Sequence, residues 1–192
     1  LSIMLKYLLI ISFNLFNIQN SEWKLKKEEN KIKVYLRENN DKIVEYLAET
    51  YIDSDINSIF NFISDFDSSY HWMYNLEQSK ILNNDSISHV YFVMEMGWPL
   101  KKRDLVSDVI YNFKSDTIIV SLNSKPNYVE QVNNIIRIKD SKSTWTLIKV
   151  DENKTKVSLQ SYALIDGVPQ FITEIFIVDG PIYSLTNLKN NF

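Results

Sequence analysis

The sequence holds few side chains with the reactivity that catalysis or metal binding requires. It has no cysteine, which excludes disulfides, thiolate nucleophiles and cysteine-based zinc sites. Its two histidines, His71 and His89, are not spaced as HxxxH or HExxH pairs, so a histidine-rich metal site is excluded as well. The three glycines form neither of the glycine-rich loops that cradle phosphates. We therefore expect a protein that requires no metal or organic cofactor.

Two groupings of polar residues could contribute acid–base chemistry. His71 follows Ser68 and Ser69, but a catalytic triad needs its nucleophile on a strained, exposed turn, and no G-x-S-x-G pattern is present. We interpret this stretch as an ordinary helix exit. Asp104 and Asp108 lie four residues apart on one strand face, where paired carboxylates could transfer protons. That spacing alone is weak support for an enzyme.

The charge balance argues against nucleic-acid binding. The formal net charge is −3, whereas proteins that bind nucleic acids usually carry a basic excess. The cationic clusters, Lys24–Lys27 and Leu100–Asp104, are short and adjoin acidic residues. We interpret them as solvated strand ends and predict no nucleic-acid partner.

The start of the chain has the layout of a secretory signal. Lys6 precedes the apolar run Tyr7–Phe16, and polar residues follow. This run is too short for a membrane-spanning helix, which needs about 20 residues. We predict that residues 1–20 are a signal peptide and that residues 21–192 form the mature domain, which would be periplasmic or secreted. An uncleaved anchor and a buried N-terminal helix are the alternatives.

Hydrophobic periodicity indicates one domain of strands that ends in a long helix. Alternation predicts a hairpin over Trp23–Leu36, and helical spacing predicts a short helix from Ile56 onward. Further strands are predicted at Ile43–Ile52, Glu77–Leu82, Ser88–Met96, Arg103–Lys114, Thr117–Ser124, Asn134–Asp140, Ser143–Asp151 and Lys154–Leu164. A helix is predicted over Gln170–Leu188, with an interruption near Gly180-Pro181.

This order of elements predicts an α+β fold. A long meander of antiparallel strands would curve into a sheet that cannot bury its concave face against itself. The C-terminal helix would cover that face and leave an internal tunnel between sheet and helix. Such tunnels are apolar with a few polar groups, and they suit a lipid or another large apolar ligand.

Several motifs make the chain resemble a START domain, the lipid-transfer module related to the steroidogenic acute regulatory protein. In order they are WKLKKEENKIKVYLR, YHWM, WPLKKRDLV, IIRIKDSKSTWTLIKV and YALIDGVPQFITEIFIVDGPIYSLTNLK. The resemblance is to the small exported bacterial form, and it extends from about Trp23 to Leu188. It implies a helix-grip (START/Bet v1-like) fold that binds a lipid or sterol-like ligand and has no catalytic residues.

On this fold the stretch GWPLKKRD connects two long strands. Trp98 would lie at the rim of the tunnel, with an apolar ring and a free N–H. Arg103 begins the next strand, and its charge would be costly inside without a carboxylate partner. Glu95, Asp104 and Asp108 are the expected partners. Two interpretations stay open: a structural ion pair that holds the loop, or contact of Arg103 or Glu95 with the polar head group of a ligand.

Two further faces are candidates for ligand contact. In the strand HVYFVMEM, Tyr91 and Glu95 share one face and the opposite face is wholly apolar, so alternation does not decide which face lines the tunnel. On the C-terminal helix, Phe171, Ile175 and Val178 fall at i, i+4 and i+7 and are predicted to touch the ligand.

The favoured function is non-catalytic binding or transfer of a lipid or other large hydrophobic molecule, by a monomer that contacts membranes transiently. A polyketide cyclase-like enzyme on the same fold is one alternative, with Asp104 and Asp108 as its candidate residues. A protein-interaction module that uses the sheet edge or the last helix is another. Trp72 and Trp145 are predicted to be core residues.

Overall fold

The computed structural model describes residues 22–38, 43–82 and 88–192. The predicted signal peptide at residues 1–20 lies outside these described residues and stays a prediction. Within the described ranges, no helix is both long and apolar enough to cross a membrane.

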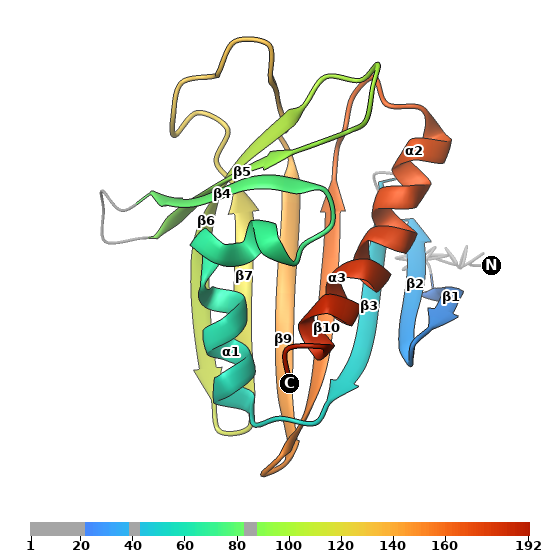
Figure 1. Ribbon diagram of the computed structural model, residues 1–192, viewed down its shortest axis with the longest axis vertical. Helices are drawn as coiled ribbons and strands as arrows, with labels where there is room; N and C mark the ends of the chain where they lie inside the picture. The colour runs from blue at the N-terminus through green and yellow to red at the C-terminus, as the bar shows by residue number, and fades with distance from the viewer. Residues whose placement is uncertain (1–21, 39–42, 83–87) are drawn as a thin grey trace, which may run out of the picture.

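In this described part of the chain, ten strands form a single sheet (Figure 1). The strands are β1 (Lys24–Glu29), β2 (Ile32–Glu38), β3 (Val44–Ile52), β4 (Leu76–Leu82), β5 (His89–Met94), β6 (Arg103–Lys114), β7 (Thr117–Ser124), β8 (Ile136–Arg137), β9 (Ser141–Asp151) and β10 (Lys154–Ala163). The helices are α1 (Ile56–Ser64), the 3₁₀ helix η1 (Phe66–His71), α2 (Gln170–Glu174), the π-helix η2 (Ile175–Asp179) and α3 (Gly180–Lys189).

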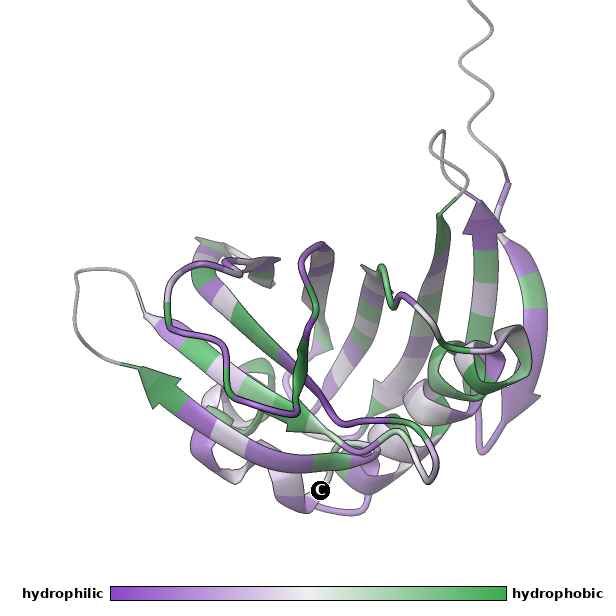
Figure 2. Cartoon of the chain, turned by 90° about the horizontal axis from the view of Figure 1, so that it is seen from above, coloured by the Kyte–Doolittle hydropathy of each residue, from purple (hydrophilic) through white to green (hydrophobic). Residues whose placement is uncertain are grey.

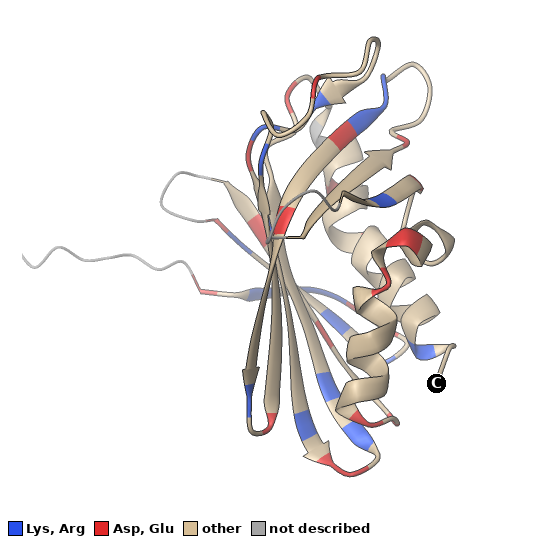
Figure 3. Cartoon of the chain, turned by 90° about the vertical axis from the view of Figure 1, so that its left-hand side faces the viewer, with Lys and Arg blue, Asp and Glu red and all other residues tan. Residues whose placement is uncertain are grey.

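The strands pair in the order β1-β2-β3-β10-β9-β7-β6-β5-β4, all antiparallel, and the short β8 adds in parallel to β6. The sheet is strongly curved in the view from above (Figure 2), and sheet and helices form two layers when the molecule is turned to its side (Figure 3). Green and purple bands alternate along the strands in Figure 2, as expected when one face packs on a core and the other faces water. This is the predicted α+β helix-grip arrangement.

The core lies on the concave face of the central strands. In β10, Val157 and Leu159 are buried and the residues between and beside them are partly exposed, which is the period of a half-buried strand. Trp72 and Trp145 are 5% and 4% exposed, and their ring centroids lie 6.0 Å apart. The prediction that both are core residues is confirmed.

The C-terminal helical segment Gln170–Lys189 packs across this face. Its backbone hydrogen bonds change from i→i+4 to the wider i→i+5 pattern in η2. Leu185 and Leu188 of α3 are completely buried. The β1–β2 hairpin holds the segment from the sheet edge, because Lys27 Nζ lies 2.8 Å from a carboxylate oxygen of Asp179.

One predicted strand is wrong. Of Asn134–Asp140 only the two residues of β8 pair with the sheet. The rest of the β7–β9 connection folds over the outer face of β5 and β6, where Arg137 forms an ion pair with Asp104 and the ring of Tyr128 stacks on His89 at 3.7 Å. These contacts hold in place a segment for which alternation alone predicts a full strand.

The other predicted strands lie within two residues of their observed bounds. The interruption predicted near Gly180-Pro181 is a π-helix that ends at Asp179, just before this pair. The helix α3 begins at Gly180, so the pair lies in its first turn.

Candidate functional site

A cavity of about 430 Å³ lies between the concave face of the sheet and the segment formed by α2 and η2. Residues of β3, β4, β5, β6, β7, β9 and β10 form its sheet side. None of the described residues that line it is Asp, Glu, Lys, Arg or His. The wall is therefore uncharged, and most of it is aliphatic or aromatic.

The buried core forms one boundary of this cavity. Trp72, Trp145 and Leu159 line the cavity and at the same time belong to the core cluster. The helical side is contributed by Thr173, Phe176 and other residues of α2 and η2. The cavity thus adjoins the hydrophobic core, and it also reaches the exposed residues Val44 and Leu164.

Three hydroxyl groups lie side by side on the cavity wall. Tyr46 of β3, Ser161 of β10 and Ser143 of β9 are direct partners in the sheet register, so they form one lateral row, which we call the hydroxyl row. Ser143 Oγ and Ser161 Oγ lie 2.7 Å apart, within hydrogen-bond distance, and Tyr46 lies beside Ser161 in the register. Burial raises the pKa of Tyr46 to about 12, so its phenol is neutral at physiological pH.

Known proteins share this architecture. No protein-family model matches the chain. It is similar to an uncharacterised protein of Pseudomonas aeruginosa, with 28% identity over 178 residues that cover 91% of this chain and 88% of that protein. It is also similar to a STAR-related lipid transfer protein from Xanthomonas axonopodis, with a TM-score of 0.80 and 25% identity over 88% of this chain and 97% of the other. The chain has the fold of a START domain.

More distant solved structures extend this comparison. Human StAR-related lipid transfer protein 5 matches with a TM-score of 0.77 and 15% identity, over 89% of this chain and 86% of that one. The Zhui aromatase/cyclase from Streptomyces sp. R1128 matches with a TM-score of 0.57 and 8% identity, over 77% and 92%. At these identities the likeness concerns the fold alone. The START resemblance predicted from the motifs is confirmed.

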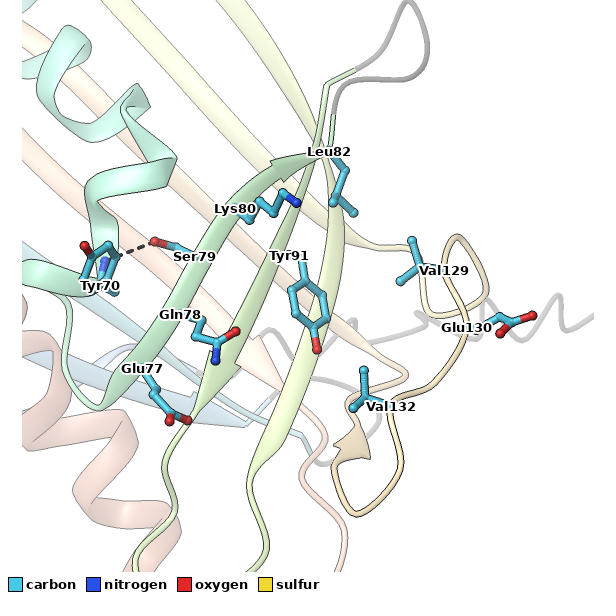
Figure 4. Close-up of a pocket in the computed structure, with 10 residues that line it drawn as sticks. All are labelled: Tyr70, Glu77, Gln78, Ser79, Lys80, Leu82, Tyr91, Val129, Glu130 and Val132. Atoms are coloured by element: carbon cyan, nitrogen blue, oxygen red, sulfur yellow. Dashed lines mark hydrogen bonds between the residues drawn. The ribbon is translucent and has the colours of Figure 1, made fainter.

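In this START-like domain β5 turns its wholly apolar face to the cavity, which Phe92 and Met94 line. Tyr91 therefore points to the outer side, into a separate groove of about 660 Å³ between β4 and the loop after β7 (Figure 4). There its hydroxyl donates a hydrogen bond to Asp104 Oδ2 at 3.1 Å. Glu95 is exposed and forms an ion pair with Lys102 at 2.8 Å. The structure places both predicted contacts away from the cavity.

Trp98 lies in the β5–β6 loop and Arg103 is the first residue of β6, and neither lines the cavity. Trp98 is 96% exposed. Arg103 is 3% exposed and pairs in the sheet with Met94, so its side chain leaves on the cavity side. Its guanidinium donates to the carbonyl oxygens of Lys101 and Asp166, and the second of these bonds ties the loop to the β10–α2 connection.

The prediction that Arg103 pairs with Glu95, Asp104 or Asp108 is wrong. Asp104 pairs with Arg137, Asp108 lies 3.2 Å from Lys125, and no ion pair of Arg103 is found within the described residues. Successive residues of a strand point to opposite faces, so the Arg103 and Asp104 side chains cannot meet. The hydrogen bonds of the Arg103 guanidinium therefore go to backbone oxygens, and the charge of Asp166 acts on it as well.

The prediction that Phe171, Ile175 and Val178 of the C-terminal helix face the ligand is wrong. Phe171 is 66% exposed, and neither Ile175 nor Val178 is among the residues that line the cavity. The lining residues are instead Thr173, Phe176 and Ile177. The period of 3.6 residues used for the prediction does not hold across a π-helix, whose turns contain more residues.

The hydroxyl row is the part of the cavity that sequence reasoning missed, although a signal was present. Ser143 and Ser161 each lie two residues from a buried apolar residue, Trp145 and Leu159, so strand alternation puts them on the inner face. Small polar residues at inward positions of apolar strands indicate a polar group in the core or in a cavity.

Proposed function

We propose that this START-like domain is a non-catalytic binder or carrier of a lipid or another large hydrophobic molecule, held in the cavity between sheet and helix. One observation carries this proposal: the cavity of about 430 Å³ has an uncharged, largely apolar lining. Small-molecule sites are typically apolar clefts of about 300–1,000 Å³ with a few polar groups. The likeness to the STAR-related lipid transfer protein of Xanthomonas axonopodis supports the same ligand class.

The two alternatives receive less support from the geometry. A cyclase-like enzyme needs acid and base groups in reach of its substrate, but no described lining residue is charged or an imidazole. Asp104 and Asp108 lie on the outer face of β6, where they pair with Arg137 and Lys125. An interaction module built on α3 would need an exposed apolar face, and Leu185 and Leu188 are buried instead.

A charge placed in the cavity should abolish binding, and a matched pair of phenylalanines tests this. Phe176 lines the cavity and Phe171, one turn earlier on the same segment, is exposed. Phe176→Asp would put an unpaired carboxylate against the ligand, so we expect affinity for the apolar fluorophore diphenylhexatriene to fall more than about tenfold. Phe171→Asp should leave it within about twofold, since a solvated charge there meets no ligand.

The measurement is fluorescence titration of both variants, with circular dichroism to verify folding. Mass spectrometry of the organic extract from the wild-type protein identifies any co-purified lipid, which the Phe176→Asp protein should lack. Equal loss of binding in both folded variants, or no diphenylhexatriene uptake by the wild type, would refute the cavity as the binding site.

We further propose that the domain exchanges its ligand at a membrane through the end that carries the β5–β6 loop. Trp98 and Phe171 are the most exposed aromatic side chains described here, and Leu164 is exposed as well. The hydrogen bond of Arg103 to the Asp166 carbonyl joins the Trp98 loop to the connection that contains Leu164. Figure 1 shows that this loop and the start of α2 reach the same end of the molecule.

Trp98→Ala should weaken vesicle binding without weakening ligand affinity. Transfer of a large apolar side chain out of water contributes roughly 1.5–3 kcal/mol, so binding to phosphatidylcholine vesicles should fall about tenfold or more. Diphenylhexatriene affinity should be unchanged, because Trp98 does not line the cavity. Cosedimentation with vesicles and fluorescence titration separate the two effects, and unaltered cosedimentation would contradict the proposed docking end.

A further inference from the structure

We propose that the hydroxyl row of Tyr46, Ser161 and Ser143 is the polar subsite of the cavity, and that it selects an uncharged lipid carrying a hydroxyl or carbonyl oxygen. This inference rests on the proposed function, because it names the ligand class of the same cavity. It is carried by three features: the unused hydrogen-bonding capacity of the row, the lack of charged side chains among the described residues that line the cavity, and the position of the row beside the apolar core.

The row has more hydrogen-bonding capacity than it uses. Three hydroxyl groups bring three protons, and the hydrogen bond between Ser161 and Ser143 engages one of them. Neighbouring backbone groups are already paired, since these residues sit in continuous ladders between β3, β10 and β9. At least one donor and several lone pairs therefore face the cavity, where a polar group without a partner is costly.

The group that completes these hydrogen bonds must be neutral. No Lys, Arg or His is among the described residues that line the cavity, so a carboxylate or phosphate placed there would stay unpaired. The Tyr46 phenol cannot supply the opposite charge to a cation either, because it remains protonated at physiological pH. A hydroxyl can both donate to and accept from the row, and a carbonyl can accept from it.

The position of the row fixes where the ligand oxygen lies. Ser161 follows Leu159, and Ser143 precedes Trp145, by two residues along their strands. Two strand residues span roughly 7 Å, so the ligand oxygen would lie about that far from the Leu159–Trp145 part of the core. The remaining apolar surface of the cavity, including Phe92 and Phe176, then contacts the hydrocarbon of the ligand.

Three probes of equal chain length test the selection: dodecan-1-ol, dodecane and dodecanoate, each used to displace diphenylhexatriene from the wild-type protein at neutral pH. One net hydrogen bond contributes about 1 kcal/mol, so the alcohol should bind about fivefold more tightly than the alkane. Dodecanoate should bind more weakly than the alcohol, because its charge has no partner at the row.

Conservative substitutions assign this preference to the row. Tyr46→Phe and Ser143→Ala each remove one hydroxyl, and each should bring the alcohol-to-alkane affinity ratio toward one while dodecane affinity is kept. Thr173→Val is the matched control, because Thr173 lines the cavity but its hydroxyl donates to the Pro169 carbonyl within its own helix. Two independent variants in the row guard against one that fails to fold.

The outcomes separate this inference from the proposed function. If the wild type does not take up diphenylhexatriene, the proposed function fails and the subsite fails with it. If it takes up the dye but binds alcohol and alkane equally, or prefers dodecanoate, the cavity stands and the subsite is refuted. An equal change of the ratio in Thr173→Val and Tyr46→Phe would also refute it, because the preference would not come from the row.

Discussion

Trp145→Ala is expected to lower the free energy of unfolding by about 3–5 kcal/mol, the usual cost of truncating a buried large aromatic side chain. Trp145 is 4% exposed and packs against Trp72. Trp145 also lines the cavity, so the void left by the substitution would join existing empty space. The surrounding side chains would not fill that enlarged space, and the full cost of the void would remain. Urea denaturation followed by circular dichroism measures the change.

Trp98→Ala is the matched control for this experiment. Trp98 is 96% exposed, so its replacement should change the unfolding free energy by no more than about 0.5 kcal/mol. Comparable destabilisation by the two substitutions would show that the assignment of Trp145 to the core and Trp98 to the surface is wrong.

A second large effect is expected at the ion pair of Asp104 and Arg137. Their side chains are 0% and 3% exposed, and the guanidinium forms two bonds of 2.8 Å to the carboxylate. Asp104→Ala would leave a buried cation without its counter-charge, which typically costs about 3–5 kcal/mol. For a domain of this size that loss corresponds to a melting temperature lower by roughly 6–20 °C.

Two comparisons define the origin of that loss. The double variant Asp104→Leu/Arg137→Met removes both charges, so its destabilisation should be clearly smaller than the sum of the two single losses. Glu95→Ala breaks the exposed pair with Lys102 nearby and should cost less than about 1 kcal/mol. Additive single losses at Asp104 and Arg137 would indicate that the two residues do not act as a buried pair.

Much of the fold follows from local patterns that the sequence shows plainly. The bounds of β7 are predicted correctly because its residues alternate with period two, as in a half-buried strand. The order of elements then leaves few ways to cover a curved antiparallel sheet, and a long C-terminal helix is the obvious cover. These features are set by neighbouring residues and by chain order, which a sequence contains.

The candidate site was harder to predict because it depends on contacts between distant segments. Both faces of β5 are covered, one by the cavity side of the core and the other by the β7–β9 connection with Tyr128 stacked on His89. Alternation cannot tell two covered faces apart, so the choice between the Tyr91 face and the Phe92 face stayed open. On the C-terminal helix, a regular α-helical period predicts the wrong face, because the π-helix η2 has a wider period.

The π-helix Ile175–Asp179 has a consequence for how this cavity can change during evolution. Such a segment amounts to one residue inserted into an α-helix, and each residue turns an α-helix by about 100°. Deleting a single residue there would rotate α2 against α3 by that angle. A different side chain of α2 would then line the cavity in place of Thr173. Leu185 and Leu188 would keep their packing in the core. Related chains could therefore acquire new ligand preferences through a change of length by one residue, with no substitution at any position that lines the cavity.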